Sequence, residues 1–411
     1  MKRLFVLLLP VLIYGEGLKE LINVSTKQND LLLSKELSKE SKAKDLESKE
    51  SGYFPTLDLG AFYKRDDEAS PFQAGDVYSG FAKLSYNIYD GGKRSSNVDQ
   101  AKEEFQSSSY ESQATKKSMA LQITQDFFNL KSLEAALESK VEAQKSLKAQ
   151  LQRVERFYEA KIATKEDIDR LQSSYDTTTY EMESIKFQIL SLKKSLELKV
   201  GKSITTLEDS SFEKVSFDKY MTLDATKALI SKEDSLRSLS ESIDSIYYPN
   251  IKIEDTYSLY GYSRDEAFAK AGVTPLDNQN TLMLSLNFRL FDYGAVAKTK
   301  EAVLLTSKAL NAQVSYQNKE QEMQFALALS RINTAKLKIA SSKSALTSAQ
   351  SAFNTIEKKY DAGIVDYVVY LDALSKKTSV KALYESSLND LEFAYATYYF
   401  YAGKNIEEFI K

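Results

Sequence analysis

The sequence predicts a mainly α-helical protein with a β-barrel part, built from two tandem repeats. Each repeat combines a long coiled-coil helical hairpin with two β-strands of membrane-spanning length. Three observations support this prediction: the positions of glycine and proline, a repeat with one fixed offset, and two different hydrophobic periodicities.

Glycine and proline separate helical tracts from extended tracts. Neither residue occurs over 93–200 or over 295–362 of the 411-residue chain. Inside a helix proline costs about 3 kcal/mol and glycine about 1 kcal/mol, so these two tracts predict long helices. Both residues gather instead in 52–92 and 249–294, together with tyrosine and phenylalanine.

The N-terminus predicts export. A basic start over 1–3 precedes an apolar run over 4–13, and small residues follow at Gly15 and Gly17. This pattern is typical of a secretory signal peptide, predicted here over residues 1–17, although a buried N-terminal helix is the alternative. No later stretch reaches 18 apolar residues, so we expect any part that enters a membrane to consist of strands.

Three motifs recur 202 residues apart, which indicates an internal duplication. Residues 89–92 (Tyr-Asp-Gly-Gly) match 291–294 (Phe-Asp-Tyr-Gly), 158–162 match 360–364, and 198–201 match 400–403. Upstream, Tyr-Phe-Pro at 53–55 matches Tyr-Tyr-Pro at 247–249. The predicted organisation is a first repeat over 18–202, a linker over 203–223, a second repeat over 224–403 and a C-terminal tail over 404–411.

Apolar residues along the glycine-free tracts recur with 3,4 spacing, the a/d pattern of a left-handed coiled coil. In the second copy this series is Ile332, Ala335, Ile339, Ser342, Leu346, Ala349, Phe353, Ile356 and Tyr360. Each tract is interrupted once, and Thr164 with Asp167 in the first copy and Asp366 in the second are predicted to cap the next helix. We therefore expect one helical hairpin over about 93–200 and another over about 295–400.

The tracts before the helices alternate between apolar and polar residues. In the second copy Leu282, Leu284, Leu286, Phe288 and Leu290 share one face, and Met283, Ser285, Asn287 and Arg289 share the other. The predicted strands, within about 54–89 and about 250–291, have the length of tilted membrane strands; a soluble hairpin with one packed face is the alternative. Four strands cannot close a barrel, which needs about eight, so other copies of the chain must complete it.

The composition leaves few groups for catalysis or metal binding. The chain has no Cys, His or Trp, and its 55 Lys and Arg nearly balance its 58 Asp and Glu. The missing residues exclude disulfides, the Ser-His-Asp triad and the common zinc sites. A balanced charge gives no electrostatic footprint for nucleic acid. We therefore expect no enzyme activity, cofactor, metal or nucleic-acid partner.

The order of these motifs resembles that of the TolC-like outer-membrane efflux proteins, over about residues 18–403. The resemblance rests on the Tyr-Pro strand start, the Tyr-Asp-Gly-Gly turn, the hairpin turns at 158–162 and 360–364, and the Val-Gly or Ala-Gly end of each repeat. Lys161 departs from the glycine that is usual in the family, there is no cysteine for a lipid anchor, and Val369 replaces one of two acids that some relatives carry.

The resemblance implies a homotrimer in the cell outer membrane that extends into the periplasm. Its 12 strands, four from each of three copies, would form a β-barrel on an α-helical tunnel. Such a protein is the passive exit duct of a tripartite efflux or type I secretion system. It passes drugs or proteins from an inner-membrane pump, with which a periplasmic adaptor protein connects it. The alternative is a periplasmic coiled-coil adaptor or structural protein without a pore, against which the strand alternation argues.

The resemblance also implies three groups of functional residues. The hairpin turns would form the periplasmic tip and the adaptor contact, through Lys161, Ile162, Ala163, Thr164, Asp167, Gly363, Ile364, Val365 and Asp366. Asp169 and Asp372 would lie at the tunnel entrance, although a solvated helix face is their alternative. The barrel lumen would be lined by Lys83, Asn87, Asn287 and Arg289, because their strand neighbours are apolar.

Overall fold

A computed structural model describes residues 16–411 apart from 69, 71 and 218, so most of the predicted signal peptide lies outside the described residues. The helices are α1 (Leu18–Gln28), α2 (Asp30–Ser51), α3 (Lys93–Glu159), α4 (Lys165–Val200), α5 (Asp224–Asp244), α6 (Glu266–Ala271), α7 (Ala295–Asp361) and α8 (Tyr367–Tyr401). The strands are β1 (Thr56–Arg65), β2 (Asp76–Tyr89), β3 (Asn250–Ser263) and β4 (Asn278–Asn287). Short 3₁₀ helices cover Ser245–Tyr247 and Ile406–Phe409.

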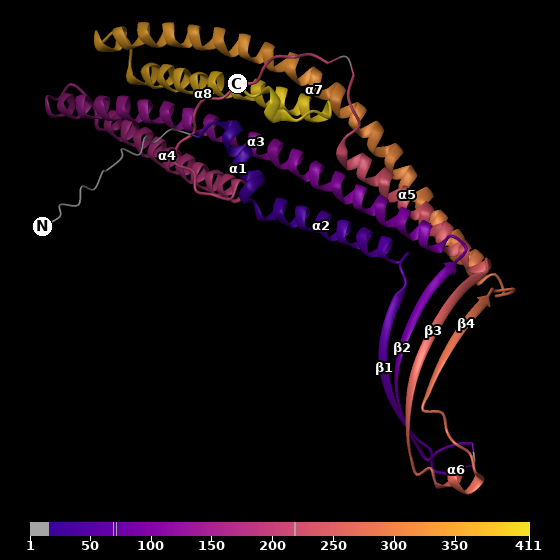
Figure 1. Cartoon of the computed structure of the whole chain (residues 1–411). Coiled ribbons are helices and arrows are strands. Elements are labelled where there is room, and N and C mark those ends of the chain that lie inside the picture. Colours follow the sequence, from indigo (N-terminus) through magenta and orange to yellow (C-terminus); the bar gives the residue numbers. More distant parts are fainter. Residues whose placement is uncertain (1–15, 69, 71, 218) are drawn as a thin grey trace, which may run out of the picture. The chain divides into compact units, whose positions relative to one another are not determined.

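The chain divides into two compact units (Figure 1). The helical unit contains the chain up to Glu36, Glu111–Ala225 and Gln317–Lys411. The sheet unit contains Leu37–Tyr110 and Thr226–Tyr316. Among the described residues, no helix is both long and apolar enough to cross a membrane.

In the helical unit α4, α3, α8 and α7 lie side by side in that order (Figure 1). Lys140 of α3 pairs with Glu181 of α4 at 2.5 Å, and the Ser342 and Ser387 hydroxyls join α7 to α8 at 2.9 Å. The predicted a/d positions face these neighbours, since Ile332, Ser342 and Phe353 are buried. The coiled-coil prediction is confirmed for the hairpins.

The predicted linker (203–223) and the predicted C-terminal tail (404–411) pack together on the helical unit. Phe212 is buried and pairs with Ile410 across a β-bridge, and the Glu213 N–H donates to the Phe409 carbonyl at 2.8 Å. The Tyr399 hydroxyl accepts from the Val215 N–H and donates to the Glu213 carbonyl. Burial raises the pKa of Tyr399 to about 12, so the hydroxyl keeps the proton that it donates.

The sheet unit carries all four strands in one antiparallel sheet of order β1-β2-β3-β4 (Figure 1). Strands from both repeats meet at the β2–β3 pair, where Leu84 lies opposite Asp255. β4 was predicted to alternate as far as Leu290, but it ends at Asn287. The last three positions were assigned from periodicity alone, and no strand of the described residues pairs with them.

Helices from both repeats also meet in the sheet unit. The Ser107 hydroxyl of α3 donates to the Ala228 carbonyl of α5 at 2.8 Å, and the Ser307 hydroxyl of α7 donates to Glu233 of α5 at 2.6 Å. Lys42 of α2 pairs with Glu104 of α3 at 2.5 Å. The order of helices here is therefore α2, α3, α5 and α7.

Candidate functional site

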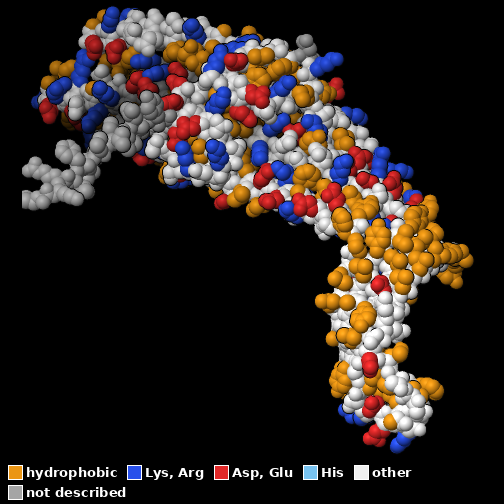
Figure 2. All heavy atoms as spheres, in the orientation of Figure 1, with side chains coloured by type: hydrophobic (Ala, Val, Ile, Leu, Met, Phe, Trp, Pro, Cys, Tyr) orange, Lys and Arg blue, Asp and Glu red, His pale blue; other side chains and the backbone are white. Residues whose placement is uncertain are grey.

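The two faces of the sheet differ in polarity, and the strand register determines which residues share a face. Lys83, Asn87 and Asn287, three of the four predicted lumen residues, lie on one face, because Asn87 pairs across to Lys252 and Asn287 pairs to Asn250. The other face carries exposed apolar side chains: Leu57, Leu59, Leu84, Leu282, Leu284 and Leu286. Figure 2 shows hydrophobic side chains gathered over the sheet.

An ion cluster lies on the polar face. The Glu254 carboxylate accepts from Lys83 and Lys252, each at 2.7 Å, and from the Ser85 hydroxyl at 3.3 Å. Glu254 is nearly buried, whereas both lysines keep about a third of their side chains exposed. Sequence reasoning missed Lys252 and Glu254, although they alternate along β3 with the apolar residues Ile251 and Ile253.

Asp255 interrupts the apolar face. It lies between Leu84 of β2 and Leu282 of β4, and its Oδ1 atom is buried without a hydrogen-bond partner. An unpaired carboxylate among apolar neighbours costs free energy. Asp255 therefore interrupts the row of apolar side chains at one level of the sheet.

Arg289 does not follow the lumen prediction, which assumed that the strand continued through it. β4 ends two residues earlier, and Arg289 lies instead in a groove at the junction of sheet and helices. Lys93, the first residue of α3, lines the same groove.

The two loops at the far end of the sheet are joined by Arg264. Its guanidinium donates to both carboxylate oxygens of Asp76, at 2.8 and 3.1 Å, and to the carbonyls of Asp66 and Gly75. The Tyr63 hydroxyl also donates to Asp76 at 2.8 Å. A bidentate contact of this kind fixes geometry as well as charge, so Arg264 ties the second loop to the first.

The first hairpin turn is exposed, and its last residues cap the N-terminus of α4. Thr164 begins α4 with a capping box, in which its hydroxyl accepts from the Asp167 N–H and the Asp167 carboxylate accepts from the Thr164 N–H. Lys161 has a left-handed backbone with φ of 60°. Ile162 is 76% exposed.

The second turn repeats this design with a simpler cap. The Asp366 carboxylate accepts from the Val369 N–H at 3.0 Å, and Gly363 takes the left-handed position with φ of 71°. Ile364 is 70% exposed, and Val365 is half-buried beside it. Both predicted caps are confirmed, and each turn presents one exposed isoleucine.

The two hairpins pack on each other next to the turns. Within the second hairpin Tyr370 is buried and stacks on Tyr360 at 4.9 Å between ring centroids, and burial raises the pKa of both phenols. Tyr370 shares a buried cluster with Leu147, Leu151 and Leu171 of the first hairpin. Arg153 of α3 donates to the Asp361 carboxylate at 2.5 Å and to its carbonyl at 3.2 Å. This contact joins the first repeat to the second, and sequence reasoning missed it because its partners lie far apart in the chain.

Asp169 and Asp372 are both exposed near the starts of α4 and α8. Offset by 202 residues, Asp169 corresponds to Leu371 rather than to Asp372. The two predicted entrance acids are therefore not equivalent positions of the repeats.

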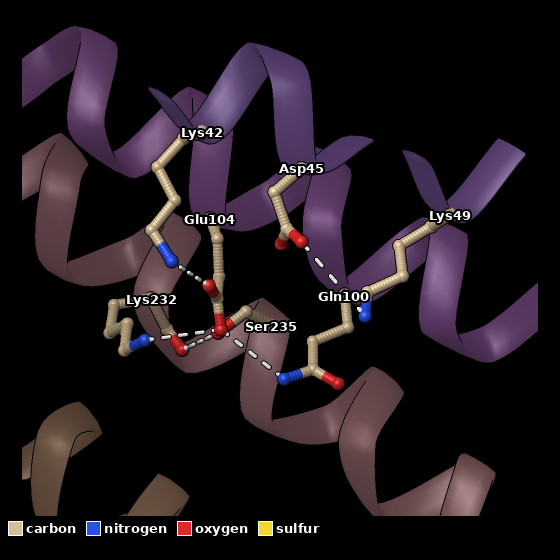
Figure 3. Close-up of polar contacts among 7 residues, drawn as sticks. All are labelled: Lys42, Asp45, Lys49, Gln100, Glu104, Lys232 and Ser235. Atoms are coloured by element: carbon tan, nitrogen blue, oxygen red, sulfur yellow. Dashed lines mark hydrogen bonds and ion pairs between the residues drawn. The ribbon is translucent and has the colours of Figure 1, made fainter. Parts of the chain in front are cut away.

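A polar network in the sheet unit joins three helices (Figure 3). Glu104 of α3 accepts from Lys42 of α2 at 2.5 Å, from Gln100 at 3.2 Å and from Lys232 of α5 at 3.5 Å. Burial raises the pKa of the Glu104 carboxyl, but the Lys42 hydrogen bond and the charge of Lys232 outweigh burial and hold the pKa below its usual value. The network connects α2 of the first repeat to α5 of the second.

Comparison with known proteins agrees with this architecture. The sequence profile described as outer membrane efflux protein matches residues 21–191. Comparison of the sequence with curated proteins finds no match.

Solved structures with the same fold cover nearly the whole chain. The outer-membrane protein VceC from Vibrio cholerae is 14% identical, with a TM-score of 0.80 over 95% of this chain and 96% of that one. The CmeC outer-membrane channel of Campylobacter jejuni is 15% identical, with a TM-score of 0.84 over 95% of this chain and 86% of that one. The open MtrE outer-membrane channel of Neisseria gonorrhoeae is 14% identical, with a TM-score of 0.76 over 95% and 89%.

The family profile covers most of the first repeat, and the shared fold extends through the second. Together with the duplicated hairpins and the two-faced sheet, these matches show that the chain has the fold of these outer-membrane channels and that residues 21–191 resemble the outer membrane efflux protein family.

Proposed function

We propose that three copies of this outer-membrane efflux protein form one passive exit duct that crosses the outer membrane and extends into the periplasm. The observation that carries the proposal is the two-faced sheet with two open edges. One face is apolar and exposed, as a lipid-facing surface is, and the other carries charged and amide side chains, as a water-filled lumen does. The duct would connect to an inner-membrane pump through a periplasmic adaptor, and it acts without a chemical step of its own.

The open edges of the sheet support the trimer. β1 and β4 each pair on one side only, and unpaired strand edges are not tolerated in lipid. Pairing β1 of one copy with β4 of the next would give 12 strands from three copies, above the minimum of about eight for a bacterial barrel.

The outer helices of the helical unit support the same assembly. α4 exposes Tyr180, Phe187 and Leu198, and α7 exposes Met323, Leu327 and Leu337. These two helices are the first and last of the four. In a ring, α4 of one copy would cover α7 of the next, and the exposed apolar side chains would be buried between them.

The hairpin turns are the proposed adaptor contact. Ile162 and Ile364 are the exposed apolar residues of two turns with firmly capped backbones. Exposed apolar side chains on a fixed backbone suit a protein partner, because little ordering entropy is lost on binding. Asp169 and Asp372, both exposed on the second turns of α4 and α8, are the proposed entrance acids.

We also propose that signal-peptide cleavage lies before Glu16. Cleavage after Gly17 would place a charged amino group at Leu18, whose side chain is fully buried and whose N–H donates to the Ser210 hydroxyl at 3.1 Å. Glu16 itself pairs with Lys202 at 2.9 Å. N-terminal sequencing of the exported protein will test this: Glu16 or an earlier residue is expected at the start, and Leu18 would contradict the proposal.

The duct is tested by placing one charge on each face of β4. Leu286→Arg puts a cation on the proposed lipid face, which costs about 2–4 kcal/mol, and should abolish trimers in the outer-membrane fraction. Asn287→Arg, the neighbouring change on the lumen face, should leave the trimer yield unchanged. Light scattering of the detergent-extracted wild type should give a mass of three chains, and the trimer should conduct ions in planar bilayers. A water-soluble monomer would refute the duct and favour the pore-free adaptor.

A further inference from the structure

The groove that contains Arg289 is a pocket of about 400 Å³ at the start of the sheet. Arg289 and Lys93 line it from two different elements, the segment after β4 and the first residue of α3. Asn250 and Asn287 supply amide groups, and Tyr248 and Phe288 supply aromatic walls. The volume is at the lower end of the range for small-ligand sites.

The two cations have no carboxylate partner among the described residues, whereas the nearby acids are committed elsewhere. Asp90, which also lines the groove, accepts from the Arg94 side chain at 2.8 Å and from the Arg94 N–H at 3.1 Å. Asp292 caps α7 through the N–H groups of Gly294 and Val296 and accepts from the Tyr247 hydroxyl. Among the described residues neither groove cation therefore forms a direct ion pair, although the charges of Arg289 and Asp292 act on each other.

Each repeat's strand-to-helix junction carries one of the two cations and lacks the other. At the offset of 202 residues, Arg289 corresponds to Asn87 within β2, and Lys93 corresponds to Ala295. The fold thus does not require a basic residue at either position, because each copy makes the junction without the cation that the other copy carries. One such groove per chain gives three per trimer.

We propose that this groove binds a phosphate group. Arginine recognises phosphate with a planar fork of donors and lysine adds a point charge, and the two asparagine amides can donate to the remaining oxygens. Two sources share this chemistry. One is the headgroup of a phospholipid at the periplasmic edge of the membrane, a level marked by the aromatic side chains Tyr247, Tyr248, Phe291 and Tyr293. The other is a phosphate-bearing solute, because Asn287 continues the polar face of the sheet into the groove. Binding of a lipid headgroup rests on the proposed duct, because it needs a membrane around the sheet, whereas binding of a solute does not.

The test uses the purified full-length protein in phosphate-free buffer and neutral detergent. In the lipid arm, mixed micelles contain dioleoylphosphatidylglycerol or, as the phosphate-free control, dioleoylglycerol, and native mass spectrometry measures retained lipid. In the solute arm, calorimetry measures binding of glycerol 1-phosphate. The variants are Arg289→Gln and Lys93→Gln, with Lys298→Gln as the control, because Lys298 is an exposed lysine of α7 that does not line the groove.

Binding in at least one arm is expected, and loss of either groove cation should weaken it about tenfold. The control should change it by less than about twofold. The proposal is overturned if the wild type binds in neither arm, or if Lys298→Gln weakens binding as much as the groove variants do. If the trimers assemble and conduct ions but bind no phosphate group, the phosphate site is rejected and the duct is not. Solute binding by a chain that forms no membrane trimer would reject the duct and keep the groove.

Discussion

The two repeats bend the chain at the same places with different residues. Gly91 and Tyr293 occupy equivalent positions after the strands, with φ of 67° and 56°. Lys161 and Gly363 occupy equivalent positions in the hairpin turns, with φ of 60° and 71°. Each repeat therefore has glycine at one left-handed position and a larger residue at the other. The surrounding helices and strands impose the bend, and glycine only makes it less costly.

The space around these positions separates the two junctions after the strands. A Cβ atom at Gly91 would lie 2.6 Å from the Tyr248 Cβ and 2.8 Å from the Ser245 carbonyl oxygen. Tyr293 is 87% exposed. Glycine is required for space in the first repeat, where the 3₁₀ helix before β3 packs against the junction, and it has become dispensable in the second.

Gly91→Ala should have the largest effect on stability. The left-handed backbone costs alanine about 1–2 kcal/mol, and the contact with the Ser245 backbone adds about as much again, so the free energy of unfolding should fall by about 3 kcal/mol. Thermal unfolding of the detergent-solubilised trimer measures this. Tyr293→Ala is the matched control and should change stability by less than about 0.5 kcal/mol. Equal losses from both variants would show that the two junctions do not differ as described.

Asp255 provides a second difference between the repeats. At the offset of the Tyr-Pro motifs it corresponds to Ala61, another member of the apolar face. Asp255→Ala should therefore stabilise the membrane-inserted trimer by about 1 kcal/mol, because it removes an unpaired carboxylate from the lipid-facing side. Folding yield into phospholipid vesicles across a urea series measures the change. Glu254→Ala, one residue away on the polar face, should lower the yield, since it leaves Lys83 and Lys252 without their shared partner. A lower yield for Asp255→Ala would reverse the assignment of the two faces.

Most of the fold follows from features that the sequence displays locally. The glycine-free tracts, the 3,4 spacing and the capping residues Thr164 and Asp366 predict the hairpins that the structure contains. Strand alternation likewise predicts the faces on which Lys83, Asn87 and Asn287 lie.

The predictions that failed or were missing depend on long-range pairing. Periodicity alone extended β4 to Leu290, but the end of a strand depends on where its partner ends. Arg153 and Asp361 are unremarkable charged helix residues until the two hairpins pack together. The C-terminal tail carries no periodic pattern, and its role depends on the linker segment around Phe212.

Glu104→Gln should have a smaller effect, because its ion pairs lie near the surface of the sheet unit. Loss of the Lys42 and Lys232 contacts should cost about 0.5–1 kcal/mol at pH 7. The pKa of Glu104 is lowered from 4.5 in the folded protein, so its contribution is fully present above pH 4.5 and is lost as the pH falls through the folded value. Unfolding midpoints of the two proteins should therefore differ at pH 7 and converge in acid. A difference that persists below the folded pKa would assign the effect of Glu104→Gln to packing.

Lys161→Gly should have the smallest effect, because two opposing terms nearly cancel. Glycine removes the left-handed strain of about 1 kcal/mol at the first hairpin turn, but it adds a similar entropy cost by loosening the unfolded chain. The net change should be a few tenths of a kcal/mol. Gly363→Ala, the opposite exchange at the equivalent position, should also change stability by only a few tenths of a kcal/mol, since no atom lies within 4 Å of the added Cβ and the same two terms oppose each other. Unfolding midpoints of the trimer measure both. If Lys161→Gly stabilised by about 1 kcal/mol and Gly363→Ala destabilised by as much, the conformational freedom of the unfolded chain would have no part in the choice between glycine and lysine. The strain of the turn alone would then distinguish the two repeats.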